Sequence, residues 1–198
     1  MKLERGKKTI IFVITHMVLC VCLNLLGHGL AAGLGLPFWL DSVGTAVMAA
    51  HMGPVPGAIV GMITNVIMSL AGQEFIVYAI VNMAVGIVVG ISYPKDLTDY
   101  FQIVITAALT AVVAIVISTP LNILFYNGYC GNIWGDALYD MLEQGGSSRI
   151  SCVLLSECFV DFPDKVLTLL LASGMIRLNL WISSKLGRKK DEEVMDND

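Results

Sequence analysis

Apolar segments that reach or approach the length of a membrane span follow one another along almost the whole chain. They cover residues 9–26, 38–52, 57–71, 75–91, 101–125 and 162–182. A helix needs about 17–25 apolar residues to cross the hydrocarbon core, where water cannot pair its backbone groups. Six such segments in 198 residues predict an all-α integral membrane protein with six transmembrane helices and no room for a separate soluble domain.

The charged residues are few and lie mostly at the two ends. Only 14% of the residues are charged, against roughly a quarter in soluble domains, so a soluble globular domain is excluded. Eight of the 12 Lys and Arg residues fall within residues 1–8 and 184–198. Because basic residues mark the cytoplasmic side of a membrane, we expect both termini in the cytoplasm and an even number of spans. The chain is then a single domain of the cell membrane, residues 1–198, with a basic cytoplasmic N-terminus at 1–8 and a cytoplasmic tail at 184–198.

The longest segment between spans, residues 126–148, is expected on the extracellular side. Within it, Trp134, Leu138, Met141 and Leu142 stand at helical spacing, which predicts a short amphipathic helix over residues 134–143. Glycines flank this helix on both sides and could act as hinges. The helix either covers a pocket as a lid or rests at the membrane interface without a ligand.

Three acidic residues and a lysine stand together around the start of the last apolar segment. Glu157, Asp161 and Lys165 are four residues apart, so they share one helical face, and Asp164 lies beside them. An isolated charge at the centre of a bilayer costs about 2.5–3.5 kcal/mol, so the cluster requires paired or watery surroundings. One lysine neutralises one carboxylate and leaves others for a ligand amine or hydroxyl. The alternative is an ion-pair network that only fixes the helix end.

Counting residues inward from the cytoplasmic ends brings other polar and aromatic side chains to the depth of this cluster. The candidate substrate-binding residues are Trp39, Asp41, Glu74, Tyr78, Asn82, Asn122, Asn127, Trp134, Glu157, Asp161 and Lys165. Aromatic rings and an excess of carboxylates favour a flat heterocycle with donor groups or a positive charge over an anion.

The common motifs of nucleotide binding and hydrolysis are absent from the sequence. It contains no G-x-x-x-x-G-K-[ST], no H-E-x-x-H and no G-x-S-x-G. We therefore expect no catalytic residues, no metal site and no cofactor. The five cysteines form no C-x-x-C pair. Cys130 either pairs with Cys152 or Cys158, in or near the outer loop, or stays reduced.

Small residues recur at intervals of four in the second and third apolar segments. Ala46 and Ala50 form one such pair, and Gly57 and Gly61 form another. This spacing lets helix backbones approach closely in lipid. The residues serve either packing within this chain or docking of another membrane protein.

Three stretches carry a resemblance to a known family. They are Leu-Pro-Phe-Trp-Leu-Asp-Ser-Val-Gly-Thr-Ala at 36–46, Gly-Pro-Val-Pro-Gly-Ala-Ile-Val-Gly at 53–61 and Asp-Phe-Pro-Asp-Lys-Val-Leu-Thr at 161–168. The chain from Lys8 to Lys190 resembles the substrate-binding S component of energy-coupling factor (ECF) vitamin transporters. The resemblance implies a six-helix subunit that captures a vitamin or a related small molecule at its outer side.

The resemblance also implies partners, namely a transmembrane coupling protein and two cytoplasmic ATPase subunits that drive uptake. Family members dock on the coupling protein through helices one to three, often with an Ala-x-x-x-Ala motif in helix one. The first apolar segment here has no alanine pair of that kind. We therefore expect docking through Ala46, Ala50, Gly57 and Gly61 instead. The lipid bilayer is the remaining partner, and no nucleic acid is expected.

Two other classes of function stay open at this point. A membrane sensor or regulatory subunit would use the same outer pocket to detect a ligand rather than to move it. An integral membrane enzyme would use Glu157, Asp161 and Asp164 for acid–base or metal chemistry, although no motif supports it.

Overall fold

The computed structural model describes residues 2–72, 76–94 and 99–195, and every regular element within these ranges is helical. The long helices are α1 (Lys2–Gly33), α5 (Tyr100–Phe125) and α7 (Arg149–Met195). The shorter elements are α2 (Val43–Met52), α3 (Pro54–Leu70), the 3-10 turn η1 (Ile76–Tyr78), α4 (Ala79–Ser92) and α6 (Ile133–Gln144). The expected all-α class is therefore confirmed for the described residues.

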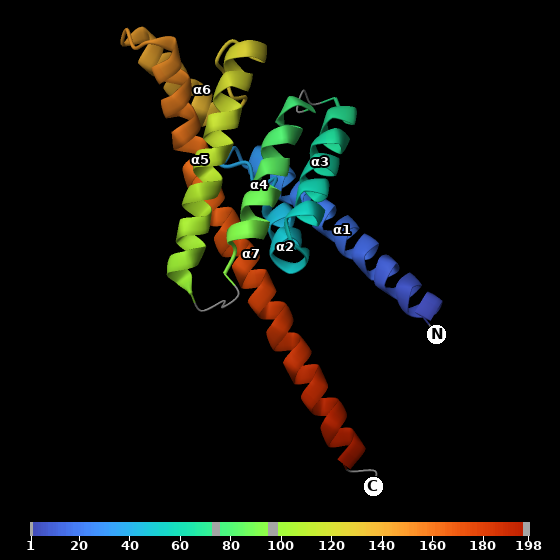
Figure 1. The fold of residues 1–198 in the computed structure, drawn as a ribbon. Coiled ribbons are helices and arrows are strands. Elements are labelled where there is room, and N and C mark those ends of the chain that lie inside the picture. The colour runs from blue at the N-terminus through green and yellow to red at the C-terminus, as the bar shows by residue number, and fades with distance from the viewer. Residues whose placement is uncertain (1, 73–75, 95–98, 196–198) are drawn as a thin grey trace.

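Within the described ranges, three helices are long and apolar enough to cross a membrane. They are Ile10–Gly33, Tyr100–Phe125 and Arg149–Lys185, and the shorter apolar helices Val43–Met52, Pro54–Leu70 and Ile76–Ser92 accompany them. Both termini lie at the lower end of the molecule in Figure 1, whereas α3 and α5 end at the upper end. The helices thus have the length and composition of an integral membrane protein.

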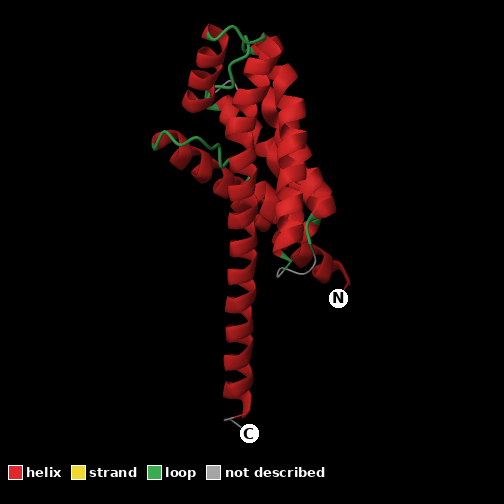
Figure 2. Cartoon of the chain, turned by 90° about the vertical axis from the view of Figure 1, so that its left-hand side faces the viewer, coloured by secondary structure: helices red, strands yellow, loops and turns green. Residues whose placement is uncertain are grey.

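Two long helices differ from the apolar segments that predicted them. α1 continues to Gly33 rather than ending near residue 26, and α7 begins at Arg149 rather than at residue 162. The expected ends were placed where the hydropathy falls. An α-helix can continue through such a polar stretch, because its backbone hydrogen bonds form whether the side chains are apolar or polar. α7 also passes through Pro163 and continues into the expected tail as far as Met195. Figure 2 shows this last part of α7 extending well beyond the other helices.

The second apolar segment is helical over only part of its expected length. The expected span 38–52 contains α2 from Val43 onward, whereas residues 34–42 form a non-helical connection between α1 and α2. Within this connection Leu40 has a positive φ of 51°. The backbone N–H groups of Trp39 and Leu40 donate to the side chain of Asp164 instead of to helical carbonyls. The connection 34–42 is therefore shaped by α7, a contact that hydropathy does not reveal.

The amphipathic helix expected over residues 134–143 is confirmed as α6, which spans Ile133–Gln144. The Asn132 side chain caps its start by accepting a hydrogen bond of 3.0 Å from the Trp134 backbone N–H. Tyr139 lies on the buried face, where it packs with Cys152 and Val153 of α7. The expected outer segment 126–148 is therefore a short helix packed along α7, with a connection on each side.

α2 lies at the centre of the helix bundle, in contact with α1, α3, α4 and α7. Its residues from Val43 to Ala49 are all buried. At Gly44 a methyl group would lie 1.9 Å from the carbonyl oxygen of Cys20, so the backbones of α1 and α2 are in direct contact. This close approach explains how a helix of ten residues can be enclosed by four neighbours.

The small residues of α2 and α3 are used for packing inside the chain. A methyl group on Gly57 would lie 2.5 Å from the Cβ of Ala49, and one on Gly61 would lie 2.5 Å from the carbonyl oxygen of Asn82. Ala46 has no exposed surface, and Ala50 is half-buried. Gly57 and Gly61 therefore pack against other helices of this chain, and Ala46 is enclosed within it. Docking of another membrane protein through Ala46, Ala50, Gly57 and Gly61 stays a prediction, and Ala50 is the most accessible of the four.

All five cysteines are free, so neither of the disulfides considered for Cys130 is present. The thiol of Cys130 lies under α6, where a methyl group on Gly135 would be 2.6 Å from its sulfur. Cys152 instead packs in the cluster formed with Tyr139 and Val153. Cys158 is exposed on the outside of α7. The three thiols therefore occupy separate environments around α6 and α7.

Candidate functional site

A pocket opens between the connection 34–42 and the helices α4, α5 and α7. The space between its lining atoms, including the part that is open to solvent, is about 520 Å³. Seven of the predicted binding residues line it, namely Trp39, Asp41, Tyr78, Asn82, Glu157, Asp161 and Lys165. These seven residues come from three separate parts of the chain, namely the connection 34–42, the segment of η1 and α4, and α7. Their contact with a ligand stays a prediction.

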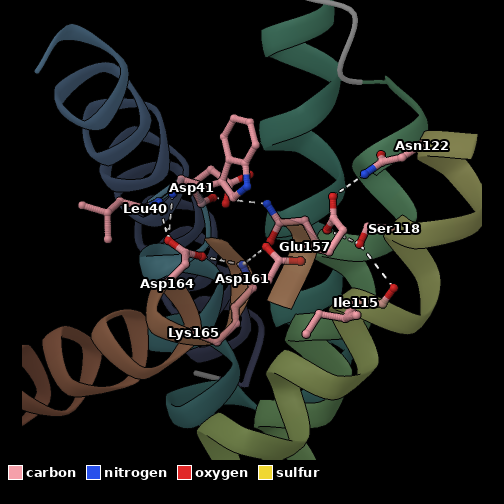
Figure 3. A network of polar contacts seen from close by, with 11 residues as sticks. Leu40, Asp41, Ile115, Ser118, Asn122, Glu157, Asp161, Asp164 and Lys165 are labelled. Atoms are coloured by element: carbon pink, nitrogen blue, oxygen red, sulfur yellow. Dashed lines mark hydrogen bonds and ion pairs between the residues drawn. The ribbon is translucent and has the colours of Figure 1, made fainter. Parts of the chain in front are cut away.

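The charged wall of the pocket is one face of α7. Glu157, Asp161 and Lys165 follow one another at intervals of one helical turn, and each is at most 4% exposed. The Lys165 ammonium lies 2.5 Å from Asp164 and 3.8 Å from Asp161. Figure 3 shows these groups meeting beside the end of the connection 34–42. The expected cluster therefore forms, and its lysine is bound most closely to the one acid that does not line the pocket.

Asp164 holds the connection 34–42 in place. One of its carboxylate oxygens accepts hydrogen bonds from the backbone N–H groups of Trp39, at 2.9 Å, and Leu40, at 2.8 Å. On the other side of the connection, a methyl group on Gly27 of α1 would lie 2.2 Å from the Leu40 carbonyl oxygen. The connection is therefore clamped between α1 and α7, which fixes Trp39 and Asp41 at the pocket.

Glu157 is the centre of a hydrogen-bonded network that joins α7 to α5 and η1. Its carboxylate accepts a hydrogen bond of 2.6 Å from the Ser118 hydroxyl and another from the Asn122 amide. The Tyr78 hydroxyl donates in turn to the Asn122 carbonyl oxygen. The Tyr78 ring stacks on Tyr126 with centroids 5.5 Å apart. In Figure 3, Ser118 and Asn122 both point from α5 toward Glu157.

Asn82 joins α3 and α4 to the same wall of the pocket. Its amide donates to the Asn65 side chain at 3.0 Å and to the Asp41 carbonyl oxygen at 3.2 Å. Next to it, the hydroxyl of Ser42 is buried, lines the pocket and has no hydrogen-bond partner among the described residues. Buried hydroxyls are usually paired, so Ser42 presents an unused hydrogen-bonding group to the pocket.

α6 is fastened to the connection 34–42 beside the pocket. The indole N–H of Trp134 donates to the Gly35 carbonyl oxygen at 2.7 Å, and the Asn132 amide donates to the Leu36 carbonyl oxygen at 3.2 Å. The Trp134 side chain itself is half exposed and does not line the pocket. Asn127, another predicted binding residue, lines a second hollow beside the connection between α5 and α6.

The connection before α6 carries one tyrosine with an altered acidity. The Tyr129 hydroxyl donates to the Asp140 carboxylate at 2.7 Å. This hydrogen bond, followed by desolvation and the charge of Asp140, raises the pKa of Tyr129 to about 12. At neutral pH the Tyr129 phenol keeps its proton, so its hydrogen bond to Asp140 holds the connection before α6 against that helix.

Two predicted binding residues remain to be placed, and the pocket also has polar lining residues that were not predicted. Glu74 lies outside the described residues, and Asn122 contacts Glu157 without lining the pocket itself. The lining also includes polar residues that the sequence did not single out for binding, namely His28, Ser42, Ser118 and Cys130.

Sequence spacing could have revealed some of these residues but not all. Ser118 stands one helical turn before Asn122, and Ser42 directly follows Asp41. No comparable signal marks His28, whose ring stacks on Trp39 with centroids 6.3 Å apart.

Among the described residues, no group of three or more His, Cys, Asp and Glu side chains is placed to hold a metal ion. The arrangement can instead bind a small polar molecule through carboxylates, amides, a hydroxyl and aromatic rings. Searches of protein families, of curated proteins and of solved structures found no match to this chain. The resemblance to S components rests only on the sequence stretches that suggested it.

Proposed function

We propose that the protein is a membrane-embedded binding subunit that captures a vitamin or a related small molecule on the outer side, as the S component of an ECF-type transporter. The observation that carries this proposal is the pocket beside Glu157. Carboxyl groups and aromatic rings from the connection 34–42, η1 and α7 line this pocket, and Glu157 and Asp161 among them are buried. Such a pocket inside a bundle of apolar helices is suited to holding a small polar ligand within a membrane.

In this proposal α1, α2, α3, α4, α5 and α7 cross the membrane and both termini are cytoplasmic. The position of the two termini at one end of the molecule supports this topology. α2 has only ten residues, about 15 Å of helix, which is too short to span a bilayer alone. Its four neighbours can shelter its ends, because non-helical backbone is tolerated in a membrane where protein surrounds it.

Uptake would need energy from partner subunits, because the sequence has no nucleotide-binding loop. A transmembrane coupling protein and two cytoplasmic ATPases would supply it. The coupling protein would dock at α2 and α3 through Ala46, Ala50, Gly57 and Gly61, of which Ala50 is the most accessible.

A membrane sensor is the second candidate, and one observation favours it. α7 carries Glu157 and Asp161 at the pocket and continues as a single helix to Met195, beyond the rest of the bundle. A continuous helix could transmit a displacement at the pocket to the far end of the molecule. The sensor would bind the same ligand but would need no ATPase.

Native mass spectrometry of the protein, purified gently from its host membrane, tests the proposal. A retained small molecule together with ATPase subunits is the expected result. A retained molecule without ATPase subunits would overturn the transporter and leave the sensor, and the absence of both would overturn both. The Glu157→Gln variant should lose the molecule, whereas Asp99→Asn should keep it, because Asp99 only caps the exposed start of α5.

A further inference from the structure

The pocket contains more acidic groups than basic ones. Asp41, Glu157 and Asp161 line it, and Lys165 is the only lysine or arginine among the lining residues. Burial makes this imbalance important, because an unpaired charge inside a protein is strongly destabilising. Either a ligand supplies positive charge or the carboxyl groups retain protons.

The single charge of Lys165 is shared between two acids, Asp164 and Asp161. Its ammonium lies 2.5 Å from Asp164, which has no exposed surface and does not line the pocket. The distance to Asp161 is longer, at 3.8 Å. One ammonium group thus serves both Asp164 and Asp161, and a single positive charge cannot also balance Asp41 and Glu157.

Neutral groups satisfy the hydrogen bonds of Glu157 without balancing its charge. Its donors are the Ser118 hydroxyl and the Asn122 amide, and its carboxyl group also contacts that of Asp161. His28 lies near Asp41 and stacks on Trp39. With His28 and Lys165 both counted as basic, the acidic residues that line the pocket still outnumber the basic ones.

We propose that the pocket takes an organic cation, namely a flat ring that carries a protonated amine. The amine would lie between Asp41 and Asp161, where it supplies the missing positive charge through charge-assisted hydrogen bonds. The ring would pack against Trp39 and Tyr78, which line the same pocket and offer aromatic faces to a cation. This inference rests on the proposed function, because it assigns a class of ligand to the same site.

The unpaired hydroxyl of Ser42 is an independent sign that a ligand completes this pocket. The residue is 1% exposed, and its oxygen has no hydrogen-bond partner among the described residues. A hydroxyl can accept a hydrogen bond from a ligand N–H at this position. The neighbouring Asp41 would then hold the charge of the same ligand, so one nitrogen-bearing group would satisfy both residues.

Three compounds that share one ring test the inference. Tryptamine is a cation at neutral pH, indole-3-ethanol is neutral and indole-3-acetate is an anion. Their binding to the full chain in lipid nanodiscs would be measured by titration calorimetry, with empty nanodiscs subtracted. We expect tryptamine to bind at least about ten-fold more tightly than indole-3-ethanol, with indole-3-acetate the weakest.

Two matched variants test whether the preference for tryptamine over indole-3-ethanol arises in the pocket. Asp41→Asn should reduce the advantage of tryptamine by about ten-fold, because it removes one charge and keeps the side-chain shape. Asp99→Asn makes the same change at the exposed cap of α5 and should leave the advantage unchanged.

The inference is overturned if tryptamine gains no advantage over indole-3-ethanol, including the case in which none of the three compounds binds. It is also overturned if Asp41→Asn leaves the advantage unchanged. The presence of ATPase subunits in the purified complex is measured separately. A neutral or anionic preference with those subunits present would therefore reject the cation while leaving the transporter in place.

Discussion

Asp164 and Leu40 are 124 positions apart in the sequence, yet the Asp164 carboxylate accepts a hydrogen bond of 2.8 Å from the Leu40 backbone N–H. The same carboxylate pairs with Lys165 at 2.5 Å. One buried acid thus joins the connection 34–42, which carries Trp39 and Asp41, to the charged face of α7. The shape of the pocket depends on this contact.

Replacing Asp164 should destabilise the protein more than replacing any exposed acid. Asp164→Ala removes the closer acid partner of Lys165 and leaves its buried ammonium with Asp161 alone, at 3.8 Å; loss of a buried ion-pair partner costs about 3–5 kcal/mol in other proteins. Thermal unfolding in detergent should show a clear loss of stability, and Asp164→Asn should be milder because its amide oxygen can still accept from Leu40. Asp99→Asn is the control at an exposed helix cap. Equal stability of Asp164→Ala and the control would contradict the clamp.

Gly44 should tolerate no side chain, because its backbone touches that of Cys20. In Gly44→Ala the new methyl group would start 1.9 Å from the Cys20 carbonyl oxygen, so the two helices must move apart. Overpacking of this kind costs about 1–3 kcal/mol. Gly174→Ala is the matched control within a helix, since nothing lies within 4 Å of the new methyl group.

We expect the control to gain about 0.5–1 kcal/mol, because alanine is the better helix former. Thermal unfolding of both variants measures the expected loss of stability in Gly44→Ala and the expected gain in Gly174→Ala. A Gly44→Ala protein as stable as Gly174→Ala would show that α1 and α2 do not approach so closely.

Trp134 should restrain α6 against the connection 34–42. Trp134→Phe keeps a large aromatic ring but removes the hydrogen bond of 2.7 Å to the Gly35 carbonyl oxygen. A bond of this kind contributes about 0.5–1.5 kcal/mol, so local opening of α6 should become a few-fold more frequent. Hydrogen exchange over residues 133–144 measures this opening. Trp181→Phe, a similarly exposed tryptophan on α7, should leave that exchange unchanged.

Tyr129 should ionise only at unusually high pH. Its folded pKa of about 12 exceeds the ordinary value of about 10, so the contact with Asp140 is fully present below about pH 10. The stability that it contributes is then lost as the pH rises through the folded pKa. Asp140→Asn removes the main cause of the shift and should return one tyrosine to ordinary titration.

Ultraviolet difference titration of the tyrosines would follow this change. Tyr129→Phe should remove the same high-pH transition from the wild-type curve. If Asp140→Asn leaves that transition in place, the hydrogen bond is not its cause.

The sequence predicted those parts of the site that depend on spacing along one helix. Glu157, Asp161 and Lys165 share a face because residues four apart are neighbours on any α-helix. The amphipathic pattern of residues 134–143 likewise predicted α6 nearly to its observed bounds. Hydropathy also indicated apolar helices of membrane-spanning character, but it misplaced the ends of α1 and α7.

The rest of the site required contacts between distant residues. The role of Asp164 could not be read from its sequence neighbours, because its partners Trp39 and Leu40 approach it only after α1 and α7 have packed on both sides of their connection. Gly57 and Gly61 show the same limit of prediction from sequence. A small residue permits close packing, but its spacing does not specify which helix packs against it.

By itself, the sequence thus determined the helical class, the apolar faces and the charged stripe of α7, all of which follow from local periodicity. Only the tertiary structure decided that Gly57 and Gly61 face neighbouring helices of their own chain. It also decided that Lys165 pairs closely with Asp164 and at a longer distance with Asp161, while Asp41 lines the same pocket. The physical reason is that pairing depends on distances across the packed bundle, which no repeat along the chain encodes.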